Sequence, residues 1–65
     1  MIIDSQEKAL TYARNILQTT GKEHVVFELK KPSRYGWTWA TCLKSEMDLY
    51  VDLAKNGFIP VDSDR

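Results

Sequence analysis

The chain has 65 residues, 43% of them apolar, and its nine basic and nine acidic side chains give a net charge of zero. A chain of this length forms one domain that buries only about 60% of its unfolded surface, which excludes a large enclosed active site. The apolar content excludes a wholly disordered chain, and the zero net charge argues against a protein that coats duplex DNA by charge alone.

The single cysteine, Cys42, excludes an internal disulfide and a cysteine-based zinc site, and it is typical of a reducing compartment. No stretch reaches the roughly 20 apolar residues that span a bilayer, and no charged leader precedes an apolar run. We therefore expect a cytoplasmic protein without a membrane partner.

The first predicted element is a helix over about residues 5–20. Asp4 and Glu7 have the spacing of a capping box, with Ser5 as a competing N-cap. Gly21 is the expected left-handed residue after the last turn. Residues 1–3 are short and apolar, which is compatible with an extra edge strand at the N-terminus or with a cap on the core. The helix carries an apolar stripe at helical spacing, made of Ala9, Leu10, Ala13, Ile16 and Leu17.

The central predicted element is a β-hairpin with strands over about residues 24–31 and 37–44. In the first strand, Val25, Phe27 and Leu29 alternate with polar residues, the period-2 pattern of a half-buried strand. The turn between the strands contains Pro32 and Gly36. We expect the register that gathers the bulky side chains of both strands on one face. This register places Leu29 opposite Trp39, Phe27 opposite Thr41 and Val25 opposite Leu43.

A second helix is predicted over about residues 46–56, followed by an extended tail over residues 58–65. Ser45 and Asp48 resemble an N-cap pair, and Asn56-Gly57 is a stop signal. Pro60 cannot donate a ladder hydrogen bond, so it confines the tail to an edge strand or to no strand. The predicted helix carries a broad apolar stripe of Met47, Leu49, Tyr50, Val51, Leu53 and Ala54.

Together these elements predict a single α+β domain over residues 1–65 in the order helix, strand, strand, helix. We expect the two amphipathic helices to pack on one face of the antiparallel hairpin, because this arrangement buries both apolar stripes. The other face, centred on Val26, Ala40 and Cys42, would stay open, and the hairpin would keep two unpaired edges. Such faces and edges favour pairing with a second copy or with another protein.

Charge is unevenly distributed along the chain. Residues 22–44 carry five basic and two acidic side chains, a net charge of +3, whereas residues 45–65 carry two basic and five acidic side chains, a net charge of −3. Cations and aromatic rings alternate around the hairpin tip, and they are the candidate binding residues: Lys30, Lys31, Arg34, Tyr35 and Trp37. In the alternative interpretation, Trp37 and Trp39 belong to the core, because a core this small needs large side chains.

Two functions of different class are compatible with this tip. The favoured one is a non-enzymatic interaction module or modulator that docks on a larger protein through the hairpin tip, the free sheet face or a sheet edge, with Arg34, Tyr35 and Trp37 as anchors. A homodimer through the sheet is a version of the same hypothesis. The other is a protein that binds single-stranded nucleic acid, with cations on phosphates and rings on bases.

Catalytic chemistry is not indicated. The chain has no glycine-rich phosphate loop and no serine-nucleophile motif, so we expect no enzymatic activity and no cofactor. His24 and Cys42 could share a face of the predicted sheet, but no third ligand has suitable spacing. We therefore expect no metal site.

Overall fold

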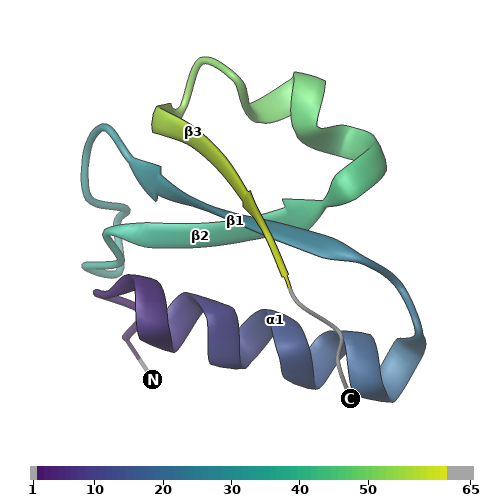
Figure 1. Ribbon diagram of the computed structural model, residues 1–65. Coiled ribbons are helices and arrows are strands. Elements are labelled where there is room, and N and C mark those ends of the chain that lie inside the picture. The colour runs from purple at the N-terminus through teal and green to yellow at the C-terminus, as the bar shows by residue number, and fades with distance from the viewer. Residues whose placement is uncertain (1, 62–65) are drawn as a thin grey trace.

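The computed structural model describes residues 2–61, in which a helix and a short 3-10 helix lie on either side of a small sheet (Figure 1). The chain forms α1 (Gln6–Thr20), β1 (His24–Leu29), β2 (Trp39–Leu43), the 3-10 helix η1 (Lys44–Tyr50) and β3 (Ala54–Pro60). The sheet has the order β2-β1-β3, with antiparallel pairing on both sides of β1. The predicted α+β class is confirmed, and the sheet has one strand more than the predicted hairpin.

The predicted first helix is confirmed. The Ser5 hydroxyl, 3.2 Å from the Lys8 backbone N–H, accepts its hydrogen bond and so acts as the N-cap. Asp4 instead pairs with the Lys8 ammonium at 2.9 Å. At the other end, Gly21 adopts a left-handed φ of 76° and donates its N–H to the Leu17 carbonyl.

The predicted register of the hairpin is wrong by one residue. Phe27 lies opposite Ala40 and Val25 lies opposite Cys42, whereas Trp39 lies opposite Glu28. A one-residue slip moves every side chain of one strand to the other face. Trp39 therefore lies on the face opposite to Phe27.

The physical reason for this error is that β1 is buried on both faces. Val25, Val26 and Phe27 are each at most 2% exposed, although consecutive side chains of a strand point to opposite sides. Gathering the bulky residues on one face is favourable only when the other face meets solvent. Because neither face of β1 meets solvent, this preference does not apply, and apolar residues are favourable on both faces.

Each face of the sheet has its own apolar core. On one face, α1 packs Ala9 and Ala13 against Val26, together with Ile3 from the N-terminal segment. On the other face, the Phe27 ring lies 5.1 Å from the Phe58 ring and 6.0 Å from the Tyr50 ring. Figure 1 shows α1 and η1 on opposite sides of the sheet. The prediction of two helices on one face is therefore wrong.

The predicted open sheet face is also absent from the described part of the chain. Val26 is 0% exposed beneath α1, and Cys42 is 6% exposed on the η1 side. Within residues 2–61, Val26 and Cys42 are therefore covered by the chain's own elements.

The predicted second helix over residues 46–56 is corrected to η1 over Lys44–Tyr50 followed by the strand β3. Asn56 and Gly57 lie within β3, where the pairing shifts between Phe27 and Leu29 and Gly57 takes a φ of 104°. Leu49, Val51 and Leu53 are each more than half exposed, so they form no buried helical stripe.

Two further predictions concern the chain ends. The edge position expected for Pro60 is confirmed, because β3 is an outer strand of the sheet. At the other end, the Ile3 carbonyl accepts hydrogen bonds from the N–H groups of Thr38 and Trp39, at 3.0 and 3.2 Å. Residues 2–4 nevertheless form no strand. The last four residues of the predicted tail, 62–65, lie outside the described residues.

Candidate binding surface

The turn at the hairpin tip is fixed by four hydrogen bonds that centre on Ser33. The Ser33 carbonyl accepts the N–H of Gly36 at 2.9 Å, closing a β-turn with Arg34 and Tyr35 as its central residues. The Ser33 hydroxyl accepts the N–H groups of Tyr35 and Trp37 at 3.2 and 3.1 Å. Ser33 also donates its own N–H to the Trp37 carbonyl at 2.8 Å. The backbone that carries Arg34 and Tyr35 is therefore held in one conformation.

The side chains at this turn point outward. Tyr35 is 72% exposed, and Arg34, Lys30 and Lys31 are exposed as well. None of these three cations lies within ion-pair distance of an acidic side chain among residues 2–61. Their charges are therefore available to an anionic group on a partner.

A shallow hollow of about 290 Å³ lies beside the end of β1. Its lining combines the apolar side chains of Leu29 and Leu53 with Lys30, Lys31 and Asp52. The Lys30 N–H donates to the Leu53 carbonyl at 3.1 Å, which fixes the segment after η1 against the end of β1. Figure 1 shows this segment and the loop between β1 and β2 at the same end of the molecule. Leu53 is 51% exposed there.

We call Lys30, Lys31, Arg34, Tyr35 and Leu53 the tip surface. Four of these residues are candidates from the sequence. Leu53 was missed because it was assigned to a buried helical stripe. Leu53 lies in the turn between η1 and β3, and no local pattern in the sequence indicates its exposure.

Trp37, the fifth sequence candidate, does not belong to the tip surface. Trp37 and Trp39 are both half-buried and pack against the core beneath α1. Both rings therefore contribute to the core in part, on the α1 side of the sheet rather than beside Phe27.

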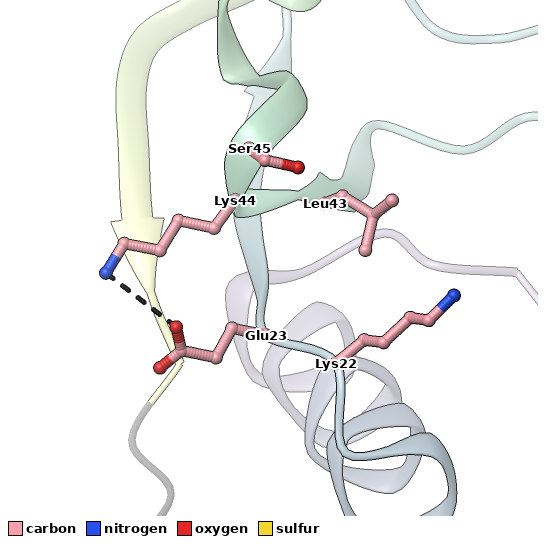
Figure 2. Close-up of a pocket in the computed structure, with 5 residues that line it drawn as sticks. All are labelled: Lys22, Glu23, Leu43, Lys44 and Ser45. Carbon is pink, nitrogen blue, oxygen red and sulfur yellow. Dashed lines mark ion pairs between the residues drawn. The ribbon is translucent and has the colours of Figure 1, made fainter.

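A second, larger hollow of about 630 Å³ lies where β2 ends (Figure 2). In Figure 2 the Lys44 ammonium faces the Glu23 carboxylate, at 3.9 Å, and the Lys22 side chain extends away from this pair. Leu43 and Ser45 complete the lining. Both members of the ion pair are more than half exposed, so the pair is loose and contributes little to stability.

His24 and Cys42 do not lie on one face as the sequence suggested. Cys42 is paired with Val25 on the η1 side, while His24 lies one position along β1 and so points to the α1 side. Burial, with a smaller contribution from the Glu46 carboxylate, raises the pKa of the Cys42 thiol and so disfavours the reactive thiolate. Residues 2–61 contain no group of three or more side chains that could hold a metal ion.

The chain matches no protein-family model, and comparisons with curated proteins and with solved structures find no match. No helix within residues 2–61 is long and apolar enough to cross a membrane. The tip surface is therefore the basis on which a function can be proposed.

Proposed function

We propose that this protein is a non-enzymatic interaction module that docks on a larger protein through its tip surface. The observation that carries the proposal is Tyr35, a large ring that is 72% exposed on a turn fixed by hydrogen bonds. Tyrosine and arginine are the usual anchors of protein interfaces, and a rigid anchor loses little conformational entropy on binding.

The surroundings of Tyr35 indicate the chemistry of the partner. Lys30, Lys31 and Arg34 lack acidic partners within residues 2–61, so they favour an acidic surface. The hollow beside Leu53 is apolar where Leu29 and Leu53 line it, between two lysines and Asp52, so this part suits one aliphatic or aromatic side chain of that surface. The partner we propose is therefore a protein segment that carries acidic residues next to an apolar one.

The proposal is tested by affinity capture from cell extract with three forms of the protein. The test variant replaces Arg34, Tyr35 and Leu53 by alanine. The control variant replaces Arg14 and Tyr12, an exposed arginine and tyrosine on α1, by alanine. Proteins retained by the wild type and the control but lost from the test variant support the proposal. Equal retention by all three forms contradicts it.

A second candidate function is binding of single-stranded nucleic acid, which is favoured by the same three cations without acidic partners beside an exposed ring. Its stacking surface is limited, because Trp37 and Trp39 pack into the core and leave Tyr35 as the exposed ring of the tip. A titration with a mixed-sequence oligonucleotide at several salt concentrations tests it. If Arg34 contacts a phosphate, Arg34→Ala lowers the slope of log affinity against log salt by about 0.7.

The remaining features of the proposal concern compartment and chemistry. We propose that the protein acts in the cytoplasm, where a single buried thiol such as Cys42 stays reduced. We propose no cofactor, metal ion or membrane partner, because binding through the tip surface requires none of them.

A further inference from the structure

The outer edge of β2 carries backbone groups that are not used within the described chain. The N–H of Leu29 donates to Thr38 and the N–H of Lys44 donates to Glu23, at 2.9 and 3.1 Å. Every second residue of β2 therefore directs its backbone groups toward β1. Thr41 and Leu43 lie between these positions, so their N–H and C=O groups point away from the sheet. None of the backbone hydrogen bonds among residues 2–61 outside the strands and helices involves either residue. Leu43 is the N-cap of η1, so its carbonyl accepts the first hydrogen bond of that helix, whereas its N–H and both groups of Thr41 have no such partner.

The opposite edge of the sheet is protected. Alternate residues of β1 direct their backbone groups toward β2 and toward β3, and Val26 directs its groups toward Ile59 in β3. The neighbours of Ile59 at alternating positions, Phe58 and Pro60, therefore direct their backbone groups outward. Pro60 has no N–H to donate, and the irregularity that contains Gly57 interrupts the strand. Within the described residues, the edge of β2 is therefore the one where two neighbouring outward positions, Thr41 and Leu43, both keep a backbone N–H that points away from the sheet.

The free part of the β2 edge is short and closed at both ends. At its start, the Ile3 carbonyl already accepts the outward N–H of Trp39 at 3.2 Å. At its other end, the chain leaves the strand after Leu43 and enters η1. A long partner strand would collide with the Ile3 segment. A strand that itself ends after Leu43 fits this gap, and β2 of a second copy is such a strand.

We propose that two copies of this chain associate by antiparallel pairing of their β2 strands about a two-fold axis at Cys42. In this register Thr41 of each copy lies opposite Leu43 of the other, and each of these two pairs exchanges two hydrogen bonds. The four bonds use both groups of Thr41 and the N–H of Leu43 in each copy, and the Leu43 carbonyl accepts a second hydrogen bond besides that of η1. The two sheets then form one continuous sheet of six strands.

The flanks of the edge are complementary under the same symmetry. Ser45 of one copy comes opposite Trp39 of the other, whose N–H is bonded to Ile3. Figure 2 shows the hollow that Lys22, Glu23, Leu43, Lys44 and Ser45 line in one copy. In the proposed pairing it faces the N-terminal segment of the other copy. That segment offers the exposed side chain of Ile2, which is 52% exposed, and the carboxylate of Asp4. Ile2 of one copy comes near Leu43 of the other, and the Asp4 carboxylate, paired with Lys8 in its own chain, comes near Lys22 and the Lys44–Glu23 pair, once on each side of the axis.

This arrangement would place the two tip surfaces at opposite ends of the dimer, because antiparallel pairing reverses the direction of the strands. One dimer could then engage two partner molecules, or two sites on one assembly.

The association is tested by sedimentation equilibrium on the full chain under reducing conditions, at protein concentrations from about 10 µM to about 1 mM. This range covers the dissociation constant expected for a contact of four hydrogen bonds. We expect the mass to rise from 7.5 kDa toward twice that value. A mass that stays at 7.5 kDa throughout would overturn the proposal.

Leu43→Pro isolates the contribution of the backbone. Leu43 has a φ of −62°, which proline adopts without strain, and its N–H makes no hydrogen bond among residues 2–61. The substitution removes one donor from each copy, so we expect the dissociation constant to rise at least about tenfold. Leu43→Ala removes the same side chain but keeps both donors, and we expect a smaller rise. Equal effects of the two substitutions would overturn pairing through the backbone.

The register is tested by an isotope-filtered NMR experiment on a mixture of labelled and unlabelled wild-type protein. Cys42 lies opposite its own copy as a non-hydrogen-bonded pair, the closer type of pair in an antiparallel sheet. We expect a strong contact between the Hα atoms of Cys42 in the two copies. A dimer that lacks this contact, or shows intermolecular contacts only elsewhere, contradicts the proposal.

Discussion

Removal of the Ser33 hydroxyl tests the reasoning that the tip surface is preorganised. In the Ser33→Ala variant, the N–H groups of Tyr35 and Trp37 lose an acceptor at 3.2 and 3.1 Å. A hydrogen bond contributes about 1 kcal/mol net. The Tyr35 N–H is exposed and can bond to water instead, whereas the Trp37 bond is partly buried and is the costlier one to lose. We therefore expect the free energy of unfolding to fall by about 1 to 2 kcal/mol.

This loss is large enough to measure in a chain of 65 residues. It corresponds to a fall in Tm of roughly 4 to 15 °C. Amide hydrogen exchange should accelerate at Tyr35 and Trp37, while the amides of β1 keep their relative protection. Ser45→Ala is the matched control, because Ser45 is exposed and its hydroxyl makes no hydrogen bond to residues 2–61. If Ser33→Ala and Ser45→Ala unfold at the same temperature with the same exchange rates, the turn is not held by Ser33.

Three further predictions concern other parts of the fold. Leu49 and Leu53 are 73% and 51% exposed. In chemical denaturation, Leu49→Gln and Leu53→Gln should therefore each change the free energy of unfolding by less than about 0.5 kcal/mol. A loss of about 2 kcal/mol or more would show that the substituted side chain is buried. The side-chain hydrogen bond and the charge of Lys8 lower the pKa of Asp4 from its usual 3.8, so this pair should stabilise the fold above pH 4 and progressively less as the pH falls through the lowered pKa. In an NMR titration the pKa of Asp4 should rise in Lys8→Met, and an unchanged pKa would refute the pairing. Burial raises the pKa of the Cys42 thiol. A thiol reagent at pH 8 should therefore modify Cys42 more slowly in the folded protein than in denaturant. Equal rates of modification would contradict the burial of Cys42.

The local structure of the first half of the chain could be predicted from the sequence. Helix α1, its boundaries and Gly21 follow from capping residues and from an apolar stripe that stays on one side of the helix. The strands β1 and β2 follow from β-branched and aromatic residues on either side of a Pro and Gly turn. These signals are local, and each is read from residues close together in the chain.

The second half could not be predicted in this way, because its structure depends on a distant partner. Ala54 continues an apolar stripe that would suit a helix, but β1 has a second edge that needs a strand, and Ala54–Pro60 supplies it. This pairing also brings Phe58 onto the Phe27 ring. Long-range pairing thus overrides local helical preference.

The error in register affected the candidate site as well as the fold. Placing all bulky residues on one face left Val26 and Cys42 on an imagined free surface, whereas the structure buries both. The four tip residues proposed from the sequence are exposed, because turn residues point outward in either register, and their role in binding stays a prediction. Trp37 lies after the turn, where its exposure depends on the position of α1.

The most direct test of binding through the tip surface is site-specific photocrosslinking in cells. A photoreactive phenylalanine derivative is introduced at Tyr35 in one variant and at Tyr12, on the outer side of α1, in another. We predict a discrete adduct at Tyr35 that protease removes and nuclease does not, and no such adduct at Tyr12. An adduct removed by nuclease would favour the nucleic-acid function instead. The same adducts at both positions, or none at Tyr35, would contradict binding through the tip surface.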